Sequence, residues 1–452
     1  MKRKLLTFEV LLAIEIIARA ILPSVFTWQL SLLLYGILLV LKGVFEGYRL
    51  NWILFIFGGL LSLLPWGIFR YLAILVVLFP IIHFPLYHHL KPKGPYRVGY
   101  KTILINKTLQ ASVYYPTYQK GPDSPQFASK IQPWQNFYDS IRLVKNNLPL
   151  WYIKIALTYL NHLKLGVNTD VPIVTEFSRD RRAFPVIIFS HGMATCRNDY
   201  SFYLKELASR GYIVISADHS DIVYPPSGQL HDIPHRNIDL KKRLVDLQSV
   251  LSFAIDPKGL KSIFDEDIEI DTTRISAVGH SFGGGAAAYL TLMDSRITGA
   301  CICLDPYYMA LDEEVFREIN RPLLIITTKS FEEAIPDNRV KVEKLARLNQ
   351  GLIKQTILGF FEHACHNNLA DNGLFMAREV EQNKALGPIR LIKKHFRNHV
   401  ALIEAFLEVM VIERETGGGA PKDRGHVIQR MQEKLYFPDI QFLETSLLSV
   451  KS

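Results

Sequence analysis

The order of apolar and polar residues divides the chain into two parts. Residues 1–90 contain only ten charged side chains and carry four almost unbroken apolar runs. These runs cover 5–22, 25–41, 52–66 and 71–87. Because each run approaches the ~20 residues that cross a bilayer, the pattern predicts an N-terminal transmembrane helical anchor over 1–90, with three or four spans.

From about residue 94 the pattern changes to short apolar runs that alternate with amphipathic stretches. We expect strands at 110–117, 184–192, 212–221, 275–281, 299–306 and 321–330. We expect helices at 200–211, 236–256 and 282–294. Apolar strands that alternate with helices are typical of a parallel sheet covered on both faces. The predicted fold class is therefore α/β, with a mostly parallel central sheet.

The same pattern sets the domain boundaries. We expect the sheet domain over 91–412 and a linker with a C-terminal tail over 413–452, because the segment TGGGAPKDRG has the composition of a flexible linker. Within the sheet domain, 120–180 is predicted to be an insertion that forms a lid or a membrane-docking element. Its apolar segment LPLWYIKIALTYLNHL, at 148–163, reads as a helix.

The distribution of charged residues predicts the orientation of the anchor in the membrane. The formal net charge is +9, but no long basic block occurs, so we expect no nucleic-acid partner. The basic clusters at 2–4, 42–49 and 91–101 would all lie on one side of a four-span anchor, and such clusters favour the cytoplasm. The predicted localisation is an integral, multi-pass membrane protein with its sheet domain in the cytoplasm. Three spans would reverse that sidedness.

The segment 279–283 carries the chemistry. Its residues read G-x-S-x-G, with Ser281 between Gly279 and Gly283, after an apolar strand and before a run of small residues. In such a turn the glycines let backbones pass close together, and the serine is exposed at the tip of a strained elbow. We predict Ser281 as the nucleophile of an acyl-transfer reaction.

A serine nucleophile needs a histidine base and an orienting carboxylate, which follow it in the order Ser, acid, His. Two histidines of the segment FFEHACHNNLADN, His363 and His366, compete for the role of the base. The acid stays open on spacing alone. Its candidates are Asp305, Glu332, Glu333 and Asp337.

An oxyanion hole requires two backbone N–H groups. We expect one from Phe282, directly after the nucleophile, and one from Met193 in the loop FSHGM that follows an early strand. The chain offers no H-E-x-x-H segment and no EF-hand loop, so we expect neither a metal nor another cofactor. The four cysteines form no disulfide framework in a chain of this length.

Several ordered segments resemble the platelet-activating factor acetylhydrolase family, of the plasma and intracellular type. They are GPYRVGY (94–100), VYYP (113–116), FSHGM (189–193), LASRGYIVISADHSD (207–221), RNIDLKKRLVDLQSVL (236–251), VGHSFGGG (278–285), CLDPYYM (303–309) and HNNLAD (366–371). The resemblance implies an α/β-hydrolase fold and a calcium-independent carboxylic ester hydrolase. It also implies Asp305 as the acid and His366 as the base, and it supports Met193 and Phe282 as oxyanion donors.

The resemblance also extends to the predicted insertion. The segment 148–163 is similar in position to the family's membrane-docking region, which implies docking residues at Trp151, Ile155 and Tyr159. The expected partners are therefore a phospholipid substrate and a lipid bilayer.

Three functions fit these observations. The first is a membrane-bound serine esterase that cleaves the sn-2 acyl ester of phospholipids with short or oxidised chains. The second is a general carboxylesterase, similar to dienelactone hydrolases, that acts on soluble esters. The third is a non-catalytic membrane scaffold with a hydrolase fold, which the set Ser281, Asp305 and His366 argues against.

Overall fold

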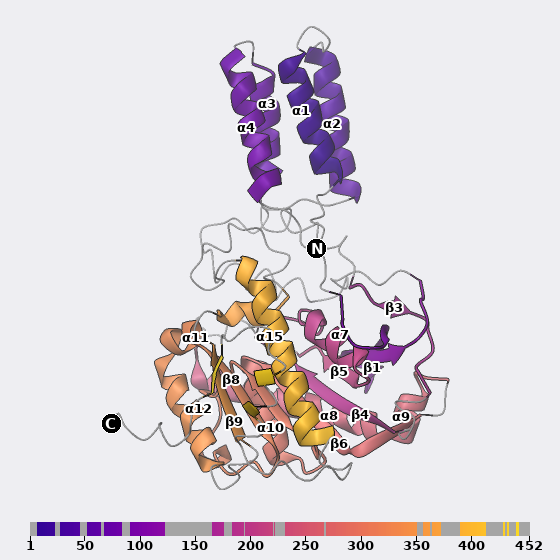
Figure 1. The fold of residues 1–452 in the computed structure, drawn as a ribbon, viewed down its shortest axis with the longest axis vertical. Coiled ribbons are helices and arrows are strands. Elements are labelled where there is room, and N and C mark those ends of the chain that lie inside the picture. The colour runs from indigo at the N-terminus through magenta and orange to yellow at the C-terminus, as the bar shows by residue number, and fades with distance from the viewer. Residues whose placement is uncertain are drawn as a thin grey trace. The chain divides into compact units, whose positions relative to one another are not determined.

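The protein is seen in a computed structural model of the whole chain (Figure 1). The structure describes residues 7–22, 28–45, 52–64, 67–83, 91–122, 165–175, 183–193, 195–219, 221, 231–265, 268–349, 356–361, 364–371, 389–412, 428–429, 432–433 and 440–442. The chain forms two compact units. The first comprises Met1–His89, Pro125–Leu165 and Leu374–Asn383, and the second comprises Leu90–Ser124, Gly166–Gly373 and Lys384–Ser452.

Among its described residues, the first unit contains four helices that pack on one another. They are α1 (Thr7–Ile21), α2 (Trp28–Phe45), α3 (Trp52–Ser62) and α4 (Gly67–His83). Small and apolar side chains from all four helices form a common core: Leu12, Ala13, Ile16, Tyr35, Phe55, Leu61, Ala73 and Val77. Charged groups are buried in the same interior. The Nζ atom of Lys42 lies 3.1 Å from Oε1 of Glu9, with both side chains almost fully buried.

The predicted transmembrane helical anchor is wrong. Among the helices of the described ranges, none combines the length and the apolar character needed to cross a membrane. Helices α1, α3 and α4 have 15, 11 and 17 residues, against the ~20 that a span needs. Helix α1 also buries the charged residues Glu9, Glu15 and Arg19 inside the unit. The integral, multi-pass localisation is overturned by the same finding, and the cytoplasmic placement loses its basis, because it depended on counting spans.

The second unit is built on one ten-stranded sheet with the order β10-β9-β8-β7-β6-β4-β5-β2-β1-β3. The strands are β1 (Arg97–Ile105), β2 (Leu109–Thr117), β3 (Asn168–Thr169), β4 (Ala183–Ser190), β5 (Ile213–Ala217), β6 (Glu269–His280), β7 (Cys301–Leu304), β8 (Leu323–Thr328), β9 (Thr356–Phe361) and β10 (Ile440–Phe442). The six central strands, from β5 to β9, run parallel. Antiparallel pairing joins β2 to β5, β1 to β2 and β10 to β9.

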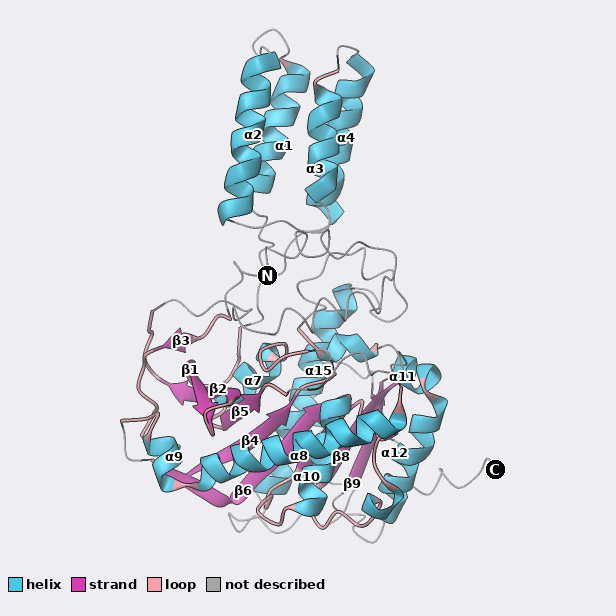
Figure 2. Ribbon diagram, turned by 180° about the vertical axis from the view of Figure 1, so that it is seen from behind, coloured by secondary structure: helices cyan, strands magenta, loops and turns pink. Residues whose placement is uncertain are grey.

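Helices lie on both faces of this sheet. Helix α15 (Ile389–Leu407) crosses the face seen in Figure 1, and α8 (Ile233–Ile255) crosses the opposite face seen in Figure 2. The other helical segments that the structure describes in this unit are α7 (Ser201–Ser209), α9 (Pro257–Lys261), α10 (Phe282–Met293), α11 (Lys329–Ala334), α12 (Pro336–Leu348), η2 (Glu313–Val315), η4 (His366–Leu369) and η5 (Glu408–Ile412). Such coverage explains why the central strands read as continuous apolar runs.

Most predicted elements of the sheet domain agree with the structure. The strand expected at 184–192 is β4, and the helices expected at 236–256 and 282–294 are α8 and α10. Strand β6 begins earlier than expected, at Glu269. The parallel α/β sheet is therefore confirmed, and only the transmembrane part of the predicted fold class fails.

Candidate active site

Ser281 sits in a tight turn between β6 and α10. Its φ is 55° and its ψ is −122°, a combination that a side-chain-bearing residue rarely adopts. Backbone hydrogen bonds hold the turn, because the Ser281 amide donates to the carbonyl of Leu304 at 2.9 Å and the Ser281 carbonyl accepts from Gly284 and Tyr307 at 2.9 Å each. The surrounding backbone therefore holds Ser281 in this strained conformation.

Glycines permit this turn by allowing contacts between main chains. A Cβ atom at Gly279 would lie 2.1 Å from the carbonyl oxygen of Gly283. One at Gly283 would lie 2.1 Å from the carbonyl oxygen of Ser190, at the end of β4. Both distances are far below a van der Waals contact, so neither site accepts a side chain without movement of the backbone. The first turn of α10 thereby packs against the loop that follows β4.

The structure brings Ser281, His366 and Asp305 together. The Nε2 atom of His366 lies 2.9 Å from Oγ of Ser281, and Nδ1 lies 2.9 Å from Oδ2 of Asp305. Asp305 follows β7 with a φ of 47° and is fully buried. Its carboxylate also accepts hydrogen bonds from the amide and hydroxyl of Thr328, at the end of the next strand. This arrangement orients one imidazole nitrogen toward the serine and the other toward the carboxylate.

His366 is held in place by two further contacts. Its backbone amide donates to Oγ of Ser330 at 3.0 Å. Its ring stacks on Phe331, with centroids 3.8 Å apart and planes 10° from parallel. Ser330 and Phe331 both belong to α11, directly after β8, so this helix supports the imidazole from one side. The sequence did not point to either residue.

The other candidates for acid and base are placed elsewhere or are not described. Glu332 pairs with Arg339, with Oε2 and Nη1 3.0 Å apart, while Glu333 and Asp337 are exposed. Burial raises the pKa of Glu332, against the opposing effects of Thr327 and Arg339. His363 lies outside the described residues. So do the docking candidates Trp151, Ile155 and Tyr159, together with most of the predicted insertion.

The two predicted oxyanion donors lie at the same edge of the sheet as Ser281. Strands β4 and β6 are parallel neighbours, with Ser190 opposite Gly279, so the residues after both strands meet there. A Cβ atom at Gly192 would lie only 3.5 Å from Cβ of Ser281. Met193 is the next residue, and Phe282 opens helix α10. The loop and the helix start therefore flank the serine.

A buried polar network lies beneath this loop, and the sequence did not predict it. Oγ of Ser190 lies 3.0 Å from Nε2 of His219, whose Nδ1 lies 3.0 Å from Oδ2 of Asp246. Burial, reinforced by the nearby Arg243, lowers the pKa of both His191 and His219 to about 3. Both rings are therefore neutral near pH 7. Polar residues directly after two neighbouring strands were the signal in the sequence.

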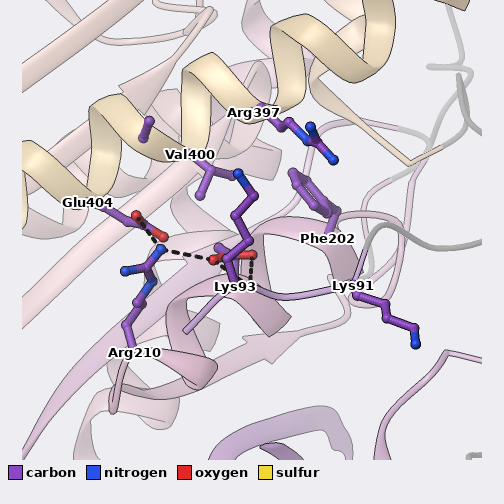
Figure 3. Close-up of a pocket in the computed structure, with 9 residues that line it drawn as sticks. Lys91, Lys93, Phe202, Arg210, Arg397, Val400 and Glu404 are labelled. Atoms are coloured by element: carbon purple, nitrogen blue, oxygen red, sulfur yellow. Dashed lines mark hydrogen bonds and ion pairs between the residues drawn. The ribbon is translucent and has the colours of Figure 1, made fainter. Parts of the chain in front are cut away.

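A separate small hollow lies between α7 and α15 (Figure 3). Arg210 occupies one side of it and forms ion pairs with Glu206 and Glu404, at 3.3 and 3.1 Å. The volume of this hollow, about 30 Å³, is enough for one or two water molecules. It is too small for an organic substrate. Within the described ranges, no group of three or more His, Cys, Asp or Glu residues is arranged to hold a metal ion.

A parallel α/β sheet with a serine at a strand-to-helix elbow, beside a histidine and a carboxylate, is the arrangement of the α/β-hydrolase fold. A solved ferulic acid esterase from Streptomyces cinnamoneus has a similar fold, with a TM-score of 0.55 and 19% identity over 79% of this chain and 99% of that one. The chain belongs to the family of platelet-activating factor acetylhydrolase, isoform II, whose family pattern matches residues 84–255 and 248–388.

Two curated relatives illustrate the membership. The platelet-activating factor acetylhydrolase of Cavia porcellus is 25% identical over 287 residues, which is 56% of this chain and 63% of that protein. That of Canis lupus familiaris is 24% identical over 320 residues, which is 62% of this chain and 68% of that protein. The chain thus spans about two thirds of the length of these relatives. The predicted family is confirmed.

Proposed function

We propose that this chain is a serine esterase that hydrolyses the sn-2 acyl ester of phospholipids, with a preference for short or oxidised acyl chains. The observation that carries the proposal is the pair of 2.9 Å contacts from His366 to Ser281 and to Asp305. The substrate class comes from the relatives, both named platelet-activating factor acetylhydrolase.

The geometry supports acylation in the following way. The Asp305 carboxylate accepts a hydrogen bond from the Nδ1–H of His366, so Nε2 carries a lone pair toward the hydroxyl of Ser281. As Ser281 Oγ bonds to the ester carbonyl carbon, its proton passes to Nε2. The amides of Met193 and Phe282 donate to the oxyanion that forms. The ester bond then breaks, and the lysophospholipid oxygen takes the proton from His366.

Deacylation repeats these steps with water. Water bonds to the acyl carbon while His366 accepts one of its protons, and the proton then returns to Ser281 Oγ as the free fatty acid leaves. No step requires a metal ion, so turnover should persist when calcium is chelated.

The test compares phospholipids with short and long sn-2 chains, and a simple soluble ester, for the wild type and three variants. Ser281→Ala, His366→Ala and Asp305→Asn should each lower kcat by about 10³-fold or more, because the three groups act as a unit. Glu333→Gln, at an exposed carboxylate, is the control and should keep full activity. Turnover that survives Ser281→Ala would refute the mechanism. Hydrolysis of the soluble ester alone would refute the phospholipid substrate and favour a general carboxylesterase.

A further inference from the structure

One buried arginine touches both segments that flank Ser281. Arg243 lies on α8, and its side chain is fully buried. Its guanidinium donates to the carbonyl of His191 and, at 3.4 Å, to the carbonyl of Gly192. It also lies over the ring of Phe282, with Cζ 4.7 Å from the ring centroid. The same group therefore contacts the loop before Met193 and the side chain of Phe282.

Asp221 holds this guanidinium in a fixed orientation. The Nε atom of Arg243 donates to Oδ1 of Asp221 at 2.8 Å, and Nη2 donates to Oδ2. Burial would raise the pKa of Asp221, but the adjacent Arg243 outweighs this effect and lowers the pKa to about 2. The Asp221 carboxylate is thus ionised at every pH at which an esterase is assayed. Because two donors meet two acceptors, the fork of the arginine cannot rotate.

Peptide geometry converts this contact into an orientation of the Met193 amide. A trans peptide is planar, and its C=O and N–H point in opposite directions. The carbonyl of Gly192 and the amide of Met193 belong to one such plane. Since Arg243 fixes where the Gly192 oxygen points, it also fixes where the Met193 N–H points.

Two more contacts hold the Gly192 oxygen, and a third holds the peptide before it. The Gly192 oxygen also accepts from Oγ1 of Thr195 at 2.9 Å, and it lies 2.7 Å from Nδ1 of His191. The amide of His219 donates to Nε2 of His191 at 3.1 Å, so the proton of this neutral ring is on Nδ1 and points to Gly192. In the preceding peptide, whose carbonyl belongs to His191, the Gly192 amide donates to the hydroxyl of Tyr200 at 3.0 Å.

We propose that Arg243 is a positioning residue for the oxyanion hole, which orients the Met193 amide through the Gly192 carbonyl and fixes Phe282 by contact with its ring. The inference rests on the proposed function, because it concerns the same acyl transfer. A buried ion pair contributes little net stability compared with apolar residues of similar volume. At this location it instead supplies directed N–H donors that an apolar side chain lacks.

The test separates transition-state stabilisation from substrate binding and from folding. Arg243→Met should lower kcat by about 10²-fold, the loss expected when one oxyanion donor is misplaced, with KM within about twofold of the wild type. The affinity for a trifluoromethyl ketone, which forms an oxyanion-bearing adduct with a serine nucleophile, should fall by the same factor as kcat/KM. Arg243→Lys keeps the charge but not the fork, so it should restore only part of the loss.

The matched control is Arg274→Met. Arg274 is another buried arginine, paired with Asp271 at 3.3 Å, and it precedes Ser281 by seven residues on β6, or about 20 Å of strand. The Arg274→Met variant should be less stable than the wild type, but the ratio of its ketone affinity to its KM should not change. If Arg243→Met does not fold, Arg243→Lys carries the same comparison.

The outcomes are distinct. Wild-type kcat for a folded Arg243→Met, or an unchanged ketone affinity beside a lower kcat, would overturn the role of Arg243. A rise in KM that accounts for the whole loss of kcat/KM would also overturn the role of Arg243. Activity that survives Ser281→Ala would instead overturn the proposed function. Any ester that the wild type hydrolyses serves for these measurements.

Discussion

Gly283 has no room for a side chain. A Cβ atom there would meet the carbonyl oxygens of Ser190 and His191 at 2.1 and 2.4 Å. Gly283→Ala should therefore push α10 away from the loop after β4. We expect a loss of about 1–3 kcal/mol in the free energy of unfolding, together with a larger loss of esterase activity. Thermal unfolding and an ester assay measure the two effects.

Gly36 provides the comparison for that substitution. It lies within α2, and a Cβ atom there would meet nothing within 4 Å. Gly36→Ala should therefore stabilise its helix by up to about 1 kcal/mol. If both alanine variants melt at the temperature of the wild type, steric crowding at the elbow is not what selects glycine.

Asp199 predicts a pH dependence of stability. Burial raises its pKa to about 7, although a hydrogen bond from the amide of Cys196, 2.9 Å away, acts in the opposite direction. The folded state therefore binds this proton more tightly than the unfolded chain, in which an aspartate has its ordinary pKa of 3.8. Stability from this group is complete below the unfolded pKa and is lost as the pH rises to about 7.

Asp199→Asn cannot ionise, so it should gain stability relative to the wild type as the pH rises from about 4 to about 7. The expected slope is at most about 1.4 kcal/mol per pH unit. Denaturant unfolding of both proteins at pH 4 and pH 8 gives the difference. Equal differences at the two pH values would show that Asp199 is not protonated in the folded state near neutrality.

At the residue scale, the structure brings together Ser281, Asp305 and His366, which the motif and the family resemblance indicated, while their catalytic roles remain predictions. The strained turn at Ser281 could be predicted, because its two glycines lie between an apolar strand and a run of small helical residues. Spacing alone could not choose Asp305 over Glu332, because both follow strands at the same edge of the sheet. The link from Arg243 to Gly192 was out of reach, because its acceptor is a backbone carbonyl 51 positions away along the chain.

Between helices α1 and α2, the buried pair Glu9 and Lys42 gives a prediction at the scale of elements. Removal of one partner leaves the other charge buried, which costs about 3–5 kcal/mol. Lys42→Met should therefore strongly destabilise the helical unit, and Glu9→Leu together with Lys42→Met should recover most of the loss. Denaturant unfolding of both single variants and the double variant gives the coupling energy. A wild-type midpoint for Lys42→Met alone would contradict the prediction.

The elements show why some patterns could be interpreted and others could not. Strands such as β4 and β8 are buried on both faces, so their apolar runs identify them directly. The pair β1 and β2 was only half predicted, because β1 alternates buried and exposed residues over part of its length. In the helical unit, the apolar runs were real, but hydropathy does not register that Glu9, Glu15 and Arg19 turn inward and meet partners.

On the scale of the whole molecule, the change of composition near residue 90 corresponds to a change of unit near Leu90. The sequence could not give the extent of the sheet. Strand β10 comes from the tail and pairs with β9, with Ile440 opposite Phe361. The three residues of β10 lie about eighty positions from their partners in β9, so the pairing leaves no local pattern in the sequence. The predicted domain boundaries, including the insertion at 120–180, remain predictions.

The four cysteines can report on how the folded chain opens, although the proposed catalytic mechanism does not involve them. Cys196, Cys301, Cys303 and Cys365 are all buried, and none of them is in a disulfide. Burial raises the pKa of Cys196 and Cys303 well above the usual range, so the reactive thiolate is scarce while the chain is folded. Alkylation should therefore be slow and should leave esterase activity intact until the sheet opens. Because Cys365 adjoins His366, mass spectrometry of each labelled cysteine over time would act as an internal clock, recording whether the histidine loop opens before the central strands do. Rapid labelling of all four thiols in active protein would contradict this order.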